Sequence, residues 1–223
     1  ADLNWFETHL GCDYLAKNPF TNAKISSKPL VSKLLCREES EMGTLIFGVM
    51  LWALPHWFKR IMPSIRITLG QPGRIIVALA ILASIILMIF GYRSAPVITI
   101  WTPPAFLVHL NSLLMLIAFA VFAVSHTKGR FRGLLRHPML HSVQIWAVAH
   151  LLVNGDLASI ILFGSMLLWA TGSILLINRA EAWNRPAPGD KPKDILFIGI
   201  TIASFLVVAA IHAFFGVWPF PSS

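Results

Sequence analysis

Long apolar blocks alternate with short, mostly basic loops along most of the chain. The blocks cover residues 43–58, 75–91, 103–125, 138–154, 157–177 and 195–217. Apolar residues fill each block on all sides instead of repeating at amphipathic spacing, which is typical of membrane-spanning helices. Gly155-Asp156 is a very short link, so we expect the fourth and fifth helices to be antiparallel neighbours. The pattern predicts an all-α polytopic membrane protein, a bundle of about six transmembrane helices.

The first 41 residues have a different character. Lysines and acidic residues alternate there, and no long apolar run is present. Met42 then leads directly into the first apolar block. We therefore interpret residues 1–41 as a polar N-terminal extension with no assigned role, and residues 42–223 as the transmembrane domain.

Composition and charge agree with a membrane protein. The chain is 56% hydrophobic and 13% charged, whereas soluble domains carry about 25% charged residues. The net charge of +8 lies mostly in the loops at 59–74, 128–136 and 179–193, while the intervening loops hold only Arg93 and Asp156. The positive-inside rule predicts a bacterial inner (cytoplasmic) membrane protein with both ends of its core in the periplasm. We expect the lipid bilayer as a partner and no nucleic acid.

The fourth block carries most of the candidate chemistry. His137, His141, Gln144, His150 and Asn154 interrupt an otherwise apolar segment. Ionisable residues inside a membrane indicate a functional site by default, and neutral histidine is the commonest metal ligand. Asn154 lies one turn after His150, where it could hydrogen-bond a ring nitrogen and orient it. The alternatives are a surface cap for His137, an interhelical hydrogen bond for His141, and for His150 a hydrogen bond to the backbone or a hydroxyl of a neighbouring helix.

Further histidines lie in other apolar blocks. His56 follows Pro55 near the end of the first block, and His109 and His212 are single histidines in later blocks. Capping for His56, or a buried hydrogen bond for the other two, is the structural alternative. No zinc-protease motif, phosphate loop, nucleophile elbow or carboxylate pair is present, so any chemistry would depend on histidine or a cofactor.

Several motifs resemble those of the NnrU family of bacterial membrane proteins. They are residues 136–140 (RHPML), 146–159 (WAVAHLLVNGDLAS), 54–56 (LPH) and 101–104 (WTPP). The resemblance covers residue 42 to the C-terminus. This family includes the plastid 15-cis-ζ-carotene isomerase, an integral membrane protein with haem b, and its bacterial members are associated with denitrification and nitric oxide metabolism.

The resemblance implies one b-type haem held by two axial histidines, His56 and His150. It also implies nitric oxide or a hydrophobic polyene as the ligand, with an isomerase-like activity in the second case. The plastid enzyme has a further histidine after its second helix, proposed as a substitute ligand. Residues 90–93 (FGYR) of this chain contain none, which argues against a ligand-switching mechanism and leaves haem binding intact.

Helix geometry gives a different pairing. The expected spans place His56 and His150 at depths that differ by roughly 15 Å, whereas two ligands of one metal, each about 2 Å from it, must lie close together. Depth alone favours other pairs: His150 with His109 or His212, and His56 with His137 or His141. We retain His56 and His150 as the metal ligands, with His109 and His137 as reserve cofactor ligands.

Two other functions remain open. A membrane scaffold or assembly factor would use the histidines only for hydrogen bonds between helices. A membrane methyltransferase is the other, because Arg-His-Pro at a helix start also resembles the enzymes that act on prenylcysteine or phospholipid headgroups. Those carry a later acid pair, which the loop at 181–184 (EAWN) lacks.

Overall fold

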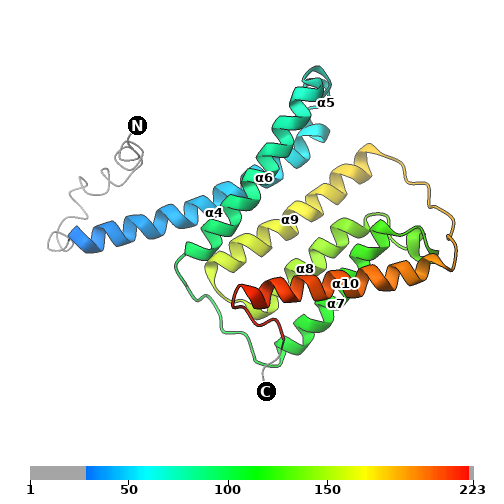
Figure 1. The fold of residues 1–223 in the computed structure, drawn as a ribbon. Helices are drawn as coiled ribbons and strands as arrows, with labels where there is room; N and C mark the ends of the chain where they lie inside the picture. Colours follow the sequence, from blue (N-terminus) through cyan, green and yellow to red (C-terminus); the bar gives the residue numbers. More distant parts are fainter. Residues whose placement is uncertain (1–28, 221–223) are drawn as a thin grey trace.

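The described part of the chain is almost entirely helical (Figure 1). The computed structural model describes residues 29–220. Its helices are α4 (Pro29–Ile61), α5 (Pro63–Thr68), α6 (Gly70–Ser94), α7 (Leu107–His126), the short 3₁₀ helix η1 (Arg130–Gly133), α8 (Pro138–Val153), α9 (Leu157–Ala180) and α10 (Lys193–Phe214). The predicted all-α bundle is confirmed.

Helix α4 crosses the expected domain boundary without a break. It begins at Pro29 and runs to Ile61, so the end of the polar extension and the first apolar block form one helix. Most of the extension, residues 1–28, lies outside the described residues. The helix also continues beyond residue 58, where we expected the first block to end, and this changes the position of His56 within it.

The long helices pack in a row with α9 near its middle. Contacts join α6 to α4, α4 to α9, α9 to α8, α8 to α7, and α7 to α10. Figure 1 shows α9 between α4 and α8. In its most apolar window α9 has 28% of its residues buried, compared with 6% for α10. Helix α9 is therefore the element against which the histidine-bearing helices α4 and α8 both pack.

Membrane-spanning character is clearest in four helices. By length and composition α6, α7, α9 and α10 could each cross a membrane, and α8 is a shorter apolar helix. The 16 residues of α8 correspond to about 24 Å of helix. Large apolar side chains on the outside of the spans, such as Leu168 at 72% exposure and Leu79 at 60%, suit a surface in contact with lipid acyl chains. The chain is thus a multi-pass membrane protein.

Glycines allow α4 and α6 to approach closely. A Cβ at Gly91 would stand 2.5 Å from the backbone nitrogen of Leu45, and one at Gly48 would stand 2.9 Å from that of Met88. Small residues at such positions are how membrane helices gain van der Waals contact, since lipid gives no hydrophobic reason for helices to associate. This packing fixes α4, and with it His56, at one side of the row.

The loops collect at the two ends of the bundle as their charges indicate. At one end Gly155 accepts hydrogen bonds from the amides of Ile100 and Trp101, at 2.8 and 3.1 Å. At the other end the amide of Gly189 donates to the carbonyl of Gly129 at 3.1 Å, and Arg185 donates to the carbonyl of Gly133. The basic loops therefore share one end, as the positive-inside pattern requires.

Candidate functional site

His56 has a fixed ring orientation in α4. Its Nδ1 lies 2.7 Å from the carbonyl oxygen of Trp52, one turn earlier. A carbonyl can only accept, so Nδ1 is the donor in this bond. The ring lies 4.3 Å from the Trp52 ring and 5.0 Å from the Trp169 ring, between centroids. The His56 ring is therefore held by its own helix through Nδ1, and Nε2 is the nitrogen left for a ligand.

His150 is held in the same way in the last turn of α8. Its Nδ1 donates to the carbonyl of Trp146 at 2.9 Å. The ring stacks on Phe163 of α9, with centroids 4.6 Å apart and planes at 29°, and it also contacts the Trp146 ring at 5.2 Å. Again Nε2 is the nitrogen left for a ligand.

Both histidines contact buried aromatic side chains of α9. Phe163, Met166 and Trp169 follow one another at three-residue spacing, and all three are buried. His56 contacts the last of them and His150 the first. The two contact points are six residues apart, which corresponds to roughly 9 Å along the helix axis and about 120° around it. Helices α4 and α8 therefore bring their histidines to α9 from different directions.

His56 lies more than one turn inside the end of α4. The first apolar block was expected to end at residue 58, whereas α4 continues to Ile61, and His56 contacts Trp169, midway along α9. The positions on α9 that His56 and His150 contact are roughly 9 Å apart along its axis, compared with the roughly 15 Å of depth expected from the spans.

Asn154 does not orient the His150 ring. Its side-chain amide donates to the backbone carbonyl of His150 at 2.9 Å. There it caps the end of α8, where backbone carbonyls lack partners within the helix. The ring of His150 is oriented by the Trp146 carbonyl instead, and this part of the predicted site is corrected accordingly.

The turn between α8 and α9 has a structural role as well. Asp156 accepts from the amide of Ser159 at 2.9 Å and caps the start of α9. The Ser159 hydroxyl also lies 2.9 Å from the Tyr92 hydroxyl of α6. A Cβ at Gly155 would overlap the carbonyl oxygen of Trp101, so only glycine fits there. Residues 154–156 thus hold helix ends and the loop before α7 together.

The reserve histidines have separate positions. His109 is exposed near the start of α7. His137 Nε2 lies 2.9 Å from the Asn178 side-chain oxygen at the end of α9. His141 bonds Gln144 within α8; the expected interhelical bond is made by Gln144, which donates to Thr171.

His212 of α10 is the remaining intramembrane histidine, and it repeats the geometry of His56 and His150. Its Nδ1 donates to the carbonyl of Val208 at 2.8 Å. Its charge interacts with that of His150, so His212 is a further residue to consider around the site.

The sequence contained a signal for this site that we did not use. His56 and His150 both follow a tryptophan by four residues, Trp52 and Trp146. In a helix this spacing brings the histidine ring to the tryptophan carbonyl and ring, so the repeated Trp-x-x-x-His pattern would have predicted both environments.

The donor set fits a porphyrin better than a bare metal ion. Within the described residues no three histidine, cysteine or acidic side chains form a group that could hold a metal. A haem iron takes four nitrogens from its porphyrin and needs only axial ligands from the protein. Two buried indole nitrogens beside His56, Nε1 of Trp52 and of Trp169, also lack hydrogen-bond partners. These are donors that an oxygen-bearing cofactor could satisfy.

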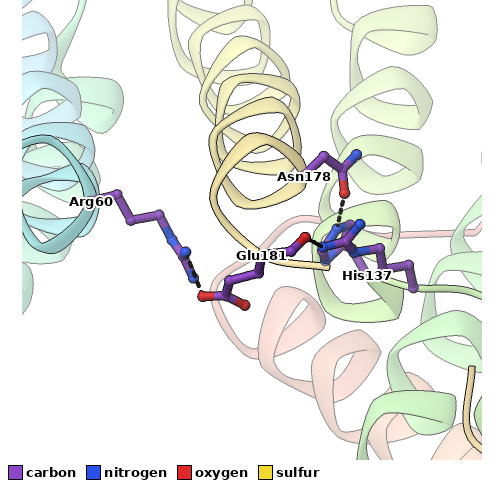
Figure 2. Close-up of polar contacts among 5 residues, drawn as sticks. Arg60, His137, Asn178 and Glu181 are labelled. Carbon is purple, nitrogen blue, oxygen red and sulfur yellow. Dashed lines mark hydrogen bonds and ion pairs between the residues drawn. The ribbon is translucent and has the colours of Figure 1, made fainter. Parts of the chain in front are cut away.

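Polar contacts tie the helix ends together on the basic side (Figure 2). Arg60 of α4 pairs with Glu181 at 2.9 Å, and Arg136 donates to the Glu181 backbone carbonyl. Nearby, His137 meets Asn178. Arg130 pairs with Asp194 at the start of α10. These contacts join α4, α8 and α9 at one end. The acid in the 181–184 loop, which the methyltransferase alternative would require for cofactor binding, is thus in an ion pair with Arg60.

Comparisons with known proteins give one family. No curated protein and no solved structure matches the chain. The family described as NnrU protein matches residues 44–219, a stretch that contains every helix from α5 to α10 and the apolar half of α4. The chain therefore belongs to the NnrU family.

Proposed function

We propose that this protein binds one b-type haem within the membrane, with His56 and His150 as its axial ligands. The proposal places the protein in the bacterial inner membrane, with the basic loops on the cytoplasmic side and the core termini in the periplasm. The function would be in nitric oxide metabolism linked to denitrification, or in cis–trans isomerisation of a polyene.

One observation carries this proposal. Two histidines on different helices have the same local geometry, with Nδ1 donating to a tryptophan carbonyl one turn earlier and Nε2 left free. Both rings lie against buried aromatic side chains of α9. A hydrogen bond at the second ring nitrogen fixes the tautomer of a metal-ligating histidine and raises its basicity. A histidine used only to link helices would direct its nitrogens to another helix.

The surrounding residues would shield a bound haem from water and orient its ligands. Met166, Trp169 and Phe163 form a buried apolar wall, and the backbone carbonyls of Trp52 and Trp146 accept from Nδ1 of His56 and His150. When bound, haem b would supply one-electron redox chemistry. His56 and His150 would hold it, and the buried aromatic side chains beside them would limit what can reach it.

The test is the absorption spectrum of purified protein, oxidised and reduced with dithionite, after expression with ample haem. We expect the split bands of six-coordinate low-spin haem. His56→Ala and His150→Ala should each lose this spectrum, while His126→Ala, at the exposed end of α7, should keep it. Colourless wild-type protein, or unchanged spectra in both alanine variants, would reject haem ligation by this pair.

A second experiment separates the substrate classes. Dithionite-reduced protein is exposed to nitric oxide in one arm and to a cis-polyene in detergent in the other. A shifted haem spectrum in the first arm supports nitric oxide metabolism, and a trans product in the second supports isomerisation. If neither is found in haem-loaded protein, and a strain lacking the gene is fully complemented by the double histidine-to-alanine variant, the scaffold alternative is correct.

A further inference from the structure

Two indole N–H groups beside His56 are buried without an acceptor. Among the described residues, Nε1 of Trp52 and Nε1 of Trp169 have essentially no solvent exposure and no hydrogen-bond partner. Trp169 is only 8% exposed as a whole. The two rings lie 5.3 Å apart and meet edge to face, and each contacts the His56 ring. Leaving a buried donor unpaired costs about 1–3 kcal/mol, so two of them in one cluster need an explanation.

The neighbouring tryptophan shows that the helices can satisfy such a group. Trp57 lies on the same helix as Trp52 and packs against the same buried cluster of Met166, Trp169 and Ala170. Its Nε1 donates to the Ser173 hydroxyl of α9 at 2.9 Å. The interface between α4 and α9 therefore provides an acceptor for Trp57 and none for the two indoles that contact the candidate ligand His56.

The charged side chain nearest to His56 along α4 does not supply the missing acceptor. Arg60, one turn beyond His56, is a donor and is paired with Glu181. A hydrocarbon polyene offers no oxygen. A porphyrin bound at His56 brings two carboxylates, which must find hydrogen-bond donors because charge is poorly tolerated at this depth. Indole N–H groups donate only, so they complement a carboxylate and suit no cationic group.

We infer that Trp52 and Trp169 donate their indole N–H groups to a carboxylate of the bound porphyrin. This inference rests on the proposed haem site, and it adds the residues that set the orientation of the porphyrin on the His56 side. It also separates two roles for the aromatic cluster. Phe163 packs on one axial histidine, whereas Trp52 and Trp169 pack on the other and bind the cofactor edge.

The experiment compares the affinity for haem b with the affinity for its dimethyl ester, whose neutral oxygens accept hydrogen bonds more weakly. Wild type should prefer haem b, and Trp52→Phe and Trp169→Phe should each weaken haem binding about 10-fold or more, since hydrogen bonds to charged groups contribute at least about 1.5 kcal/mol and 1.4 kcal/mol is tenfold. Both variants should also lose the preference for haem b over its dimethyl ester. Trp57→Phe is the matched control and should keep the wild-type ratio.

A measurement on the wild type alone covers the case in which a variant does not fold. Ultraviolet resonance Raman spectra report indole N–H hydrogen bonding, and two indoles should change from unbonded to bonded when haem is added. Three results would overturn the inference while leaving haem ligation standing. They are a wild-type preference for haem b over its dimethyl ester in both Trp52→Phe and Trp169→Phe, an equal loss of that preference in Trp57→Phe, and an indole spectrum that does not change when haem is added. Wild type that binds no haem would instead refute the proposed function itself.

Discussion

Replacing Gly155 with alanine should separate the loop before α7 from the turn between α8 and α9. The added Cβ would overlap the Trp101 carbonyl oxygen and stand 2.8 Å from its carbonyl carbon. Both are backbone atoms, so no side-chain rotation relieves the contact. The loop must move, and the amides of Ile100 and Trp101 then lose their bonds to the Gly155 carbonyl, as Leu157 loses its bond to the Ile98 carbonyl.

The size of the effect follows from these three bonds. At about 0.5–1.5 kcal/mol each, their loss should lower the free energy of unfolding by about 2–4 kcal/mol. Gly164→Ala is the matched control: it lies within α9 and its Cβ would meet no atom within 4 Å. That substitution should stabilise the protein by about 0.5–1 kcal/mol, because alanine has less freedom to lose in a helix.

Reversible unfolding in mixed detergent micelles, followed by circular dichroism, measures both variants against wild type. Hydrogen exchange at residues 100 and 101 adds a local readout, and it should become faster in Gly155→Ala alone. If Gly155→Ala unfolds at the same point as wild type with those two amides still protected, the turn does not hold the loop and the steric reasoning is wrong.

Three smaller predictions concern polar contacts between elements. In a double-mutant cycle of Gln144→Leu and Thr171→Val, detergent unfolding should give a coupling of about 0.6 kcal/mol, typical of membrane interhelical hydrogen bonds; zero coupling would contradict the bond at 2.8 Å. Asp156→Ala should destabilise by about 1 kcal/mol through loss of the α9 cap, and a wild-type unfolding curve would speak against it. Arg60→Gln should change stability by less than about 1 kcal/mol, because its partner Glu181 is exposed and such pairs contribute little; an effect above 2 kcal/mol would show that the pair is shielded from water.

The amino-acid sequence was sufficient to predict the apolar helices and the family. In lipid, an apolar block longer than a turn or two has few alternatives to a helix, because its backbone groups must be paired within the segment. The short turn at Gly155 likewise predicted that α8 and α9 are neighbours, and they pack together. These features depend on local composition and chain length, which a single sequence contains.

The environment of each histidine could not be predicted in the same way. It depends on how α4 and α8 are rotated about their axes against α9, and that rotation is set by packing, including the close approach of α4 to α6 at Gly48. Asn154 illustrates the difficulty, because helical spacing placed it near His150 correctly but did not show that it bonds the backbone carbonyl. Trp169 was missed because it comes from a third helix.

The most direct test of the shared haem is electron paramagnetic resonance of the oxidised protein, grown with ¹⁵N-labelled histidine and compared with unlabelled protein. If His56 and His150 bind one iron, the spectrum is that of low-spin ferric haem, and pulsed measurements show two labelled axial nitrogens. Each of His56→Ala and His150→Ala then removes one of them. A high-spin signal, a single labelled axial nitrogen in the wild type, or two that persist in either variant would contradict the shared site.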